Sequence, residues 1–375
     1  MIEYICNRCN TTHPIDAVRY KCDCGAPLNL KKPGSVLPIK EITQRDNSIW
    51  RYREALSITN DRSIVSLGEG MTPLVPFENG LCNHHLKLDF VFPTGSYKDR
   101  GASVLLSKAR ELGVREVVED SSGNAGAAIA AYSAKAGIDC TIYCPTSTSE
   151  GKLTQISMYG ARLKLIEGSR AATTQAVLHA AETTYYASHN WNPFFLEGTK
   201  TIAFEIAEQL GWKAPDHVIC PIGFGSVYVG LYIGFQELQA QKAITKIPRL
   251  LGVQSAACCP IYKAYAENQS QIERFPQTYE TLAEGITSEL PIRTQMITEA
   301  IGGTNGAIMI VDEEEIKAGI RMLASKGIYV EPTSAVIVEA FDKFAKSGII
   351  REGDLTVSIL TGSGLKATDK LMKLA

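Results

Sequence analysis

The sequence lacks several features that would place the protein in a specialised class. Its 375 residues contain no apolar run long enough to span a bilayer. The N-terminus, "MIEYICNRCN", does not show the basic-then-apolar pattern of a secretory signal. The net charge of −2 gives no overall field that would favour nucleic acid or an anionic membrane. We therefore expect a cytoplasmic protein that binds neither nucleic acid nor a membrane.

Aromatic residues are few, at 8%, but hydrophobic residues reach 45% and charged residues 21%, as in ordinary globular proteins. A chain of 375 residues exceeds what one compact core usually holds, so we expect two lobes with small additions. The expected domains are a Cys-rich segment at 1–34, a large cofactor-binding domain at 35–97 and 200–375, and a small substrate-side domain at 98–199.

Cysteine is concentrated at the N-terminus, where four of the ten cysteines lie within the first 24 residues. They form a C-x-x-C and a C-x-C, and they are Cys6, Cys9, Cys22 and Cys24. Two such knuckles can supply four thiolates to a tetrahedral Zn²⁺, with His13 as an alternative ligand. The other interpretation is a degenerate ribbon of reduced thiols without metal. A disulfide framework is not expected in a chain of this size without a signal pattern.

The rest of the chain alternates short apolar segments with helical patterns that often end in Gly. Strands are expected at "REVVE", "DCTIYCP", "ARLKLIEG", "HVICPIG", "RLLGVQS" and "LTVSIL", with helices between them, including one over 170–186. This alternation predicts parallel sheets covered by helices.

Three Gly/Ser-rich turns follow expected strands: Ser121–Gly126, Gly223–Ser226 and Thr361–Gly364. Ligands bind at the carboxyl ends of strands in parallel sheets, although each turn alone is ordinary loop chemistry. "GFGS" precedes a helix and can cradle a phosphate. A nicotinamide dinucleotide is disfavoured, because the glycine spacing differs from G-x-G-x-x-G and "RLLGVQS" does not end in a ribose-binding acid.

A lysine in "PTGSYKDRG" completes the pattern. A reactive Lys98, a phosphate cradle, the amide of Asn124 and the hydroxyl of Thr361 together suit pyridoxal phosphate. The lysine would form a Schiff base, and Asn124 would bond the ring hydroxyl. A neutral hydroxyl at the pyridine nitrogen would not force its protonation, which suits elimination and replacement reactions.

Six motifs, "PTGSYKDRG", "SSGNAG", "LEGTKTIAFEI", "PIGFGS", "VEPTSA" and "TGSGLK", resemble the threonine synthase family of fold type II pyridoxal-phosphate enzymes. The resemblance runs from about Leu67 to Lys366. It implies two lobes, each with a helix-covered and mostly parallel sheet, a homodimer, Schiff-base formation by Lys98, and contact of Asn124 with O3′. It also places Thr361 at the pyridine nitrogen. The implied phosphate loop is Gly223, Phe224, Gly225, Ser226 and Val227, and the implied substrate-carboxylate site is Ser121, Ser122, Asn124 and Ala125.

The sequence departs from this family where the substrate phosphate binds. Phe195, Phe224 and Ala125 stand where the family has Arg, Asn and Thr. Desolvating a phosphate against phenyl rings without a guanidinium partner costs several kcal/mol or more. We therefore expect β- or γ-replacement or elimination on a small L-amino acid, with O-phosphohomoserine disfavoured.

Other functions stay open at this point. The chain could be a genuine threonine synthase in which Arg293 or another cation enters the pocket. It could also resemble a serine/threonine dehydratase or a cysteate synthase. A non-catalytic paralogue that binds pyridoxal phosphate is the alternative from a different class, but such a protein need not keep Lys98, Asn124 and Thr361.

Overall fold

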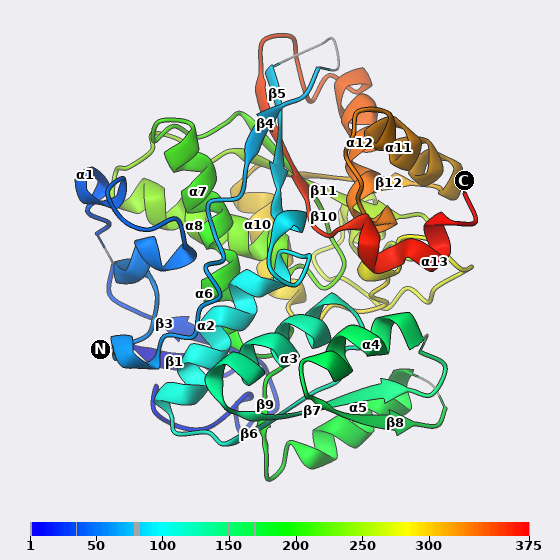
Figure 1. The fold of residues 1–375 in the computed structure, drawn as a ribbon. Helices are drawn as coiled ribbons and strands as arrows, with labels where there is room; N and C mark the ends of the chain where they lie inside the picture. The colour runs from blue at the N-terminus through cyan, green and yellow to red at the C-terminus, as the bar shows by residue number, and fades with distance from the viewer. Residues whose placement is uncertain (1, 35, 79–82, 149, 169, 375) are drawn as a thin grey trace. The chain divides into compact units, whose positions relative to one another are not determined.

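The computed structural model describes residues 2–34, 36–78, 83–148, 150–168 and 170–374. The chain divides into two compact units (Figure 1). Unit 1 comprises Met1–Gly70 and Lys98–Thr199, and unit 2 comprises Met71–Tyr97 and Lys200–Ala375. Residues 35–70, which the sequence interpretation assigned to the large domain, group with unit 1. The assignment of cofactor and substrate roles to particular domains stays a prediction.

Unit 1 contains a four-stranded parallel sheet in the order β8-β7-β6-β9. Its strands are β6 (Glu116–Glu119), β7 (Asp139–Pro145), β8 (Arg162–Ile166) and β9 (Tyr185–Tyr186). Helices α3 (Asn124–Ala136), α4 (Glu150–Met158) and α5 (Arg170–Ala180) pack on its strands, and α2 (Lys98–Glu111) packs against α3 and α6 (Pro193–Thr199). The apolar face of α3 consists largely of alanines, which allows close packing on the sheet, and the helix ends at Gly137 with φ +67°.

The prediction of a helix over 170–186 is wrong at its C-terminal end. Helix α5 stops at Ala180, and Tyr185–Tyr186 forms β9, which pairs in parallel with β6. The segment "TTYY" is β-branched and aromatic, a composition that favours an extended backbone. Both tyrosines are buried, so packing on the sheet decides the conformation.

A three-stranded antiparallel sheet precedes this body and belongs to unit 1. We call it the ribbon: β1 (Glu3–Cys6), β2 (Thr12–Pro14) and β3 (Leu28–Lys31), in the order β2-β1-β3. The short helical elements that follow it are α1 (Ile39–Ile42), η1 (Ile49–Ala55) and η2 (Asp61–Ser63). Tyr4 and Leu28 of the ribbon share one hydrophobic core with α2 and α3.

Unit 2 contains a six-stranded sheet in the order β12-β11-β10-β13-β5-β4, in which only the β4–β5 pair is antiparallel. Its strands are β4 (Leu74–Pro76), β5 (Asn83–Leu88), β10 (His217–Pro221), β11 (Arg249–Ser255), β12 (Ala307–Val311) and β13 (Leu355–Leu360). Its helices are α7 (Thr201–Gln209), α8 (Ser226–Ala240), α9 (Pro260–Ala266), α10 (Thr294–Gly303), α11 (Glu313–Ser325), α12 (Pro332–Lys346) and α13 (Thr368–Leu371), with the short η3 (Asp89–Val91), η4 (Glu284–Ile286) and η5 (Gly364–Ala367).

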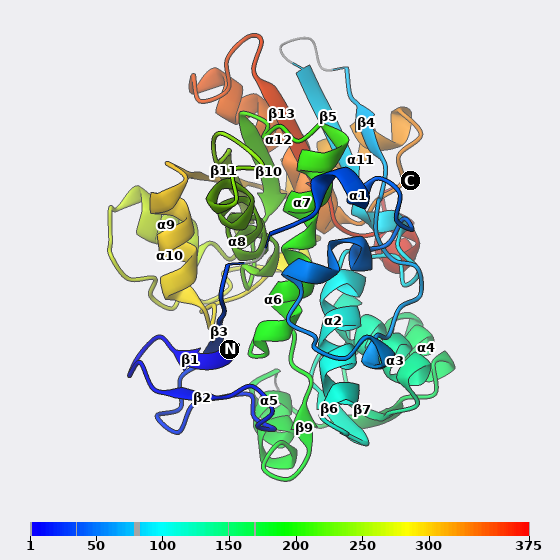
Figure 2. The ribbon, with the colours of Figure 1, turned by 90° about the vertical axis from the view of Figure 1, so that its left-hand side faces the viewer.

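In unit 2, α8 packs on β10 and β11, as Figure 2 shows, and α12 packs on β10 to β13. The expected α/β class, with helix-covered and mostly parallel sheets and a small Cys-rich ribbon, is confirmed. Within the described ranges, no helix combines the length and hydropathy that crossing a bilayer requires.

Candidate active site

Lys98 is the first residue of α2 and is half-buried in unit 1. Its Nζ atom lies 5.6 Å from the centroid of the Phe195 ring. Gly101, one turn along α2, allows this arrangement, because a Cβ atom there would come within 2.5 Å of the Phe195 ring. Phe195 is fully buried in α6, so unit 1 brings together two of the expected site residues.

The loop "SSGNAG" joins β6 to α3, also in unit 1. No side chain caps the N-terminus of α3, so backbone N–H groups of its first turn face the loop. Gly126 is required here, since a Cβ atom would lie 1.8 Å from the Ser121 carbonyl oxygen. Ser122 and Asn124 are half-buried and Ala125 is buried. A helix N-terminus of this kind favours an anion such as a carboxylate.

A buried acid–histidine pair lies in the same unit, and sequence analysis did not predict it. Glu119 ends β6, and its Oε1 atom lies 2.6 Å from Nδ1 of His189. Burial raises the pKa of Glu119 well above its usual range. Burial, followed by the positive charge of Lys98, lowers the pKa of His189 well below its usual range. Burial therefore favours the uncharged form of both groups. The His189 ring also contacts Phe195, with centroids 6.0 Å apart.

In unit 2, the "GFGS" turn connects β10 to α8. Gly225 precedes the helix with φ +91°, a conformation that L-residues rarely adopt, and a Cβ atom there would lie 2.6 Å from Ile297 Cδ1. A Cβ atom on Gly223 would lie 2.8 Å from the Cα atom of Ile286 in η4. No side chain caps α8. The two glycines thus hold the backbone of this turn close to the helix start, where N–H groups can bind a phosphate.

Thr361 follows β13 in unit 2. Its Oγ1 atom lies 3.0 Å from Ser334 Oγ, which accepts hydrogen bonds from the backbone N–H groups of Thr361 and Gly362. The backbone N–H of Tyr97 donates to the Thr361 carbonyl oxygen at 2.9 Å. The Tyr97 hydroxyl lies 2.8 Å from Ser226 Oγ, at the start of α8. The residue before Lys98 therefore connects the end of β13 with the expected phosphate loop.

Comparison with known proteins agrees with these features. Residues 65–362 match the family described as "Pyridoxal-phosphate dependent enzyme". A threonine synthase of Methanocaldococcus jannaschii is 35% identical over 380 residues, covering 98% of this chain and 94% of that protein. A threonine synthase of Halalkalibacterium halodurans is 36% identical over 338 residues, covering 87% and 92%.

This chain belongs to the threonine synthase family of pyridoxal-phosphate-dependent enzymes. The resemblance predicted from the six motifs is confirmed. The solved structure of a threonine deaminase from Solanum lycopersicum has a TM-score of 0.71 at 19% identity, covering 92% of this chain and 96% of that chain. That similarity shows a shared fold.

The residues present fit the cofactor of this family. The glycine cradle at α8 offers backbone donors without a charged side chain in the turn, and Thr361 offers a neutral hydroxyl. Tyr97 and Ser334 were not predicted. Their signals in the sequence are their positions, directly before Lys98 and within "VEPTSA". Glu331 of the same motif lies against Gly362, where a Cβ atom would come within 2.3 Å of its carboxyl carbon.

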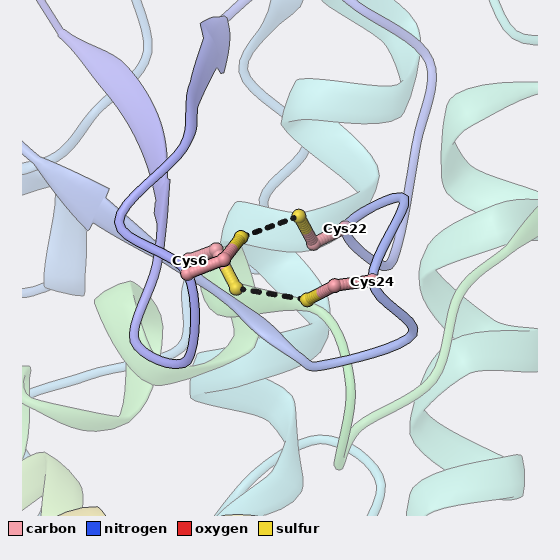
Figure 3. A group of neighbouring side chains, drawn as sticks. Cys6, Cys22 and Cys24 are labelled. Atoms are coloured by element: carbon pink, nitrogen blue, oxygen red, sulfur yellow. Dashed lines mark hydrogen bonds between the residues drawn. The ribbon is translucent and has the colours of Figure 1, made fainter.

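The four N-terminal cysteines converge in unit 1. Figure 3 shows Cys6, Cys22 and Cys24 pointing toward one another, and the Sγ atoms of all four lie within 4.8 Å of each other. The Sγ atoms of Cys6 and Cys24 are 3.5 Å apart, and those of Cys9 and Cys22 are 3.6 Å apart. His13 contacts this group from outside, with Nε2 3.4 Å from Cys22 Sγ.

Proposed function

We propose that this pyridoxal-phosphate-dependent lyase performs elimination or replacement on a small L-amino acid whose side chain carries no phosphate. The observation that carries the proposal is the fully buried Phe195 ring beside Lys98 Nζ. A phosphorylated side chain brought to this position would lose water against an aromatic surface, at a cost of several kcal/mol. A short apolar or hydroxylated side chain would not meet this cost.

When bound, pyridoxal phosphate withdraws electrons from the α-carbon of the amino acid attached to it. Lys98 Nζ would anchor the cofactor covalently and then move the α-proton as a base. Lys98 lies at the start of α2 against Phe195, and this ring would limit the volume open to the substrate side chain. The Asn124 amide would form a hydrogen bond with O3′ of the cofactor. The Thr361 hydroxyl would face the pyridine nitrogen without forcing its protonation.

Two helix N-termini would bind the two anions. The turn Gly223–Ser226, with Val227, would hold the cofactor phosphate through backbone N–H groups of α8. Ser121, Ser122 and the N–H groups at the start of α3 would hold the substrate carboxylate. Phe224 lies within the first of these turns, where it adds no polar group for a second phosphate.

The test is a comparison of substrates with the cofactor-loaded enzyme. O-Phospho-L-homoserine, O-phospho-L-serine, L-threonine, L-serine and L-homoserine would be incubated separately, and phosphate, ammonia, 2-oxo acids and amino-acid products would be measured. We expect turnover of an unphosphorylated amino acid and at most trace phosphate release. Efficient phosphate release from O-phospho-L-homoserine would refute the proposal.

The second candidate is threonine synthase itself, which converts O-phosphohomoserine and water to threonine and phosphate. It is supported by the names of the relatives and by Arg293, a buried residue directly before α10. Burial lowers the pKa of Arg293 to about 10. Ile297, one helical turn later, contacts Gly225 of the expected phosphate loop. If threonine and phosphate form in equal amounts, Arg293→Leu should raise KM for the phosphorylated substrate at least tenfold.

The homodimer and the cytoplasmic location are also proposed. The dimer rests on analogy with the family alone, and light scattering of the purified protein would test it. The nine described cysteines are all free, which supports a reducing compartment; Cys82 lies outside the described residues. Cell fractionation with an antibody against the full chain would test the location.

A further inference from the structure

Two tight turns bring the sulfur atoms of four cysteines close together. In the first, the Asn10 N–H donates to the Cys6 carbonyl oxygen at 2.9 Å, and Asn10 adopts φ +57°. In the second, the Gly25 N–H donates to the Cys22 carbonyl oxygen at 2.8 Å, and Gly25 adopts φ +84°. Each turn contributes two thiols to a group whose sulfurs all lie within 4.8 Å of one another. We call the four residues the cysteine cluster: Cys6, Cys9, Cys22 and Cys24.

The sulfur spacing matches a tetrahedral metal site. Zn–S bonds of about 2.3 Å in a tetrahedron place sulfurs about 3.8 Å apart. In the cluster, the Sγ atoms of Cys6 and Cys24 are 3.5 Å apart and those of Cys9 and Cys22 are 3.6 Å apart. A disulfide requires about 2.05 Å. Two of the four cysteines, Cys6 and Cys22, are buried, so water has little access to their sulfurs.

The ribbon is too small to be held by its own core. Its strands contain four, three and four residues. Protein segments below about 40 residues usually need a metal, disulfides or an external surface to stay folded. Arg8 donates to the Cys24 carbonyl oxygen at 3.2 Å, and Arg19 NH1 lies 3.2 Å from His13 Nε2. These two cations lie close to a centre that would carry a charge of −2 with four thiolates and one Zn²⁺.

We propose that the cysteine cluster binds one structural Zn²⁺, and that this metal fixes the ribbon as a support for helix α6. Four thiolates leave no open position on the metal, so the site is structural. The proposal does not depend on the substrate or the cofactor of the enzyme.

The support for α6 consists of two contacts that start from the ribbon. Tyr4, two residues before Cys6 in β1, packs edge-to-face on Phe194, with ring centroids 6.0 Å apart. Lys32, directly after β3, donates to both carboxylate oxygens of Glu197 at 3.1 Å. Glu197 is buried and also accepts a hydrogen bond from Ser57 at 2.7 Å. The ribbon therefore contacts α6 on both sides of Phe195 in the sequence.

Helix α6 also contacts α2. A Cβ atom on Gly198 would lie 1.9 Å from the Arg100 carbonyl oxygen, and Phe195 lies against Gly101. Helix α6 has only seven residues, too few to be stable alone. Its position, and with it the position of Phe195 relative to Lys98, depends on α2 and on the ribbon together. A metal site in the ribbon would thus help to position Phe195, the residue that we propose limits the substrate side chain.

Metal analysis of the purified full chain is the first test. We expect about one zinc per chain by mass spectrometry, and loss of most of it in Cys9→Ser and Cys24→Ser, which replace exposed thiols. The matched control is Cys259→Ser, in unit 2, which should keep its zinc. Absence of zinc after addition of ZnSO₄ to the reduced protein would overturn the proposal. Iron at one per chain, or two disulfides by thiol counting, would overturn it as well.

Hydrogen exchange tests the support of α6. Removing zinc with a chelator should speed amide exchange in the peptide 190–200 by about tenfold or more, while α12 stays unchanged. Tyr4→Leu should speed exchange in the same peptide although the zinc content stays at one per chain. If α6 exchanges equally in the zinc-loaded and zinc-free proteins, the cluster has no role in positioning this helix and the proposal fails.

Discussion

The two units offer different kinds of functional group. In unit 1, the buried groups near Lys98 are side chains that can gain or lose a proton. In unit 2, the turn Gly223–Ser226 and the end of β13 offer backbone N–H groups and neutral hydroxyls. In unit 1, Glu119 and His189 form a buried pair close enough to Lys98 for its charge to lower the pKa of the histidine. In unit 2, the expected binding groups are the backbone around Gly225 and the Ser334–Thr361 hydroxyl pair.

The difference indicates two ways of building a site. Backbone groups fixed by glycine bind an anion in one protonation state and change little with pH. Side chains that titrate can move protons, but their pKa values depend on burial and neighbours. We therefore expect substitutions near Lys98 to change chemistry and selectivity, and added Cβ atoms near Gly225 to change cofactor affinity. Four predictions would test this contrast.

The largest effect is expected for Lys98→Ala. Without the covalent anchor and proton carrier, turnover should fall by roughly 10³-fold or more, and the visible absorption of the protein-bound cofactor should change. Absorption spectra and steady-state rates would measure both. Lys135→Ala, at an exposed position near the end of α3, is the matched control and should behave as the unaltered enzyme. An unchanged spectrum in Lys98→Ala would remove this lysine from the site.

Gly225→Ala should weaken cofactor binding by about tenfold or more. The alanine would adopt φ +91° and meet Ile297, at a cost of about 1–2 kcal/mol or more. Titration of the cofactor-free protein with pyridoxal phosphate would measure the affinity. Gly302→Ala is the control, because a Cβ atom there meets nothing within 4 Å and lies within a helix. Equal affinities in the two variants would argue against a backbone cradle at α8.

Phe195→Leu should change selectivity by about tenfold, measured as the ratio of kcat/KM for a larger and a smaller amino-acid substrate. The smaller side chain would open space beside Lys98. Phe344→Leu is the matched control, because that ring is also fully buried but lies in α12, and each variant should lose about 1 kcal/mol of stability. If both variants change the ratio equally, the effect comes from lost stability and Phe195 has no special role.

The smallest effect concerns His84, a buried histidine in unit 2. It stacks on Phe341 with centroids 4.4 Å apart, and its Nε2 lies 2.8 Å from Ser358 Oγ. Burial lowers the pKa of His84 to about 3. Because the unfolded chain has a histidine pKa of about 6.5, it binds more protons than the folded chain below that pH. This group should therefore cost about 1.5 kcal/mol of stability between pH 6.5 and pH 5.

His84→Gln, which keeps a polar group for Ser358, should flatten this part of the stability curve. Urea unfolding at several pH values would measure the difference from the unaltered protein. An equal slope in both proteins would mean that His84 becomes protonated without cost. Replacing His189, which is also buried with a lowered pKa, should flatten the stability curve as well. Only the His189 variant should also alter activity, because His189 lies near Lys98, so activity measurements would distinguish the two histidines.

Motifs and periodicity predicted much of this structure. The strands around the three Gly/Ser-rich turns and the position of Lys98 at the start of a helix follow from local composition, and the structure contains them. The roles of the expected binding residues stay predictions. They rest on motif resemblance and on the local geometry of each unit.

Features that depend on long-range pairing were not predicted. Strand β5 reads "NHHLKL", which looks polar, but Lys87 is fully buried and its Nζ lies 2.8 Å from Glu205 Oε2, 118 residues later. Glu119 and His189 are likewise 70 residues apart. A charged or polar residue is predicted to be exposed unless its partner is known. Patterns within a short window of sequence therefore predict the burial of such residues wrongly.

The pairing of β5 with β13 also has a consequence for how the chain is made. Strand β5 ends at Leu88, yet its parallel partner begins at Leu355, near the C-terminus. During synthesis, β4 and β5 leave the ribosome long before β13. Strand β5 therefore lacks its parallel partner until almost the whole remaining chain has been made. The elements of unit 1 are complete once Thr199 has been made. The newborn protein therefore carries an unpaired strand edge until its last strand has been translated, and exposed strand edges favour association with other chains.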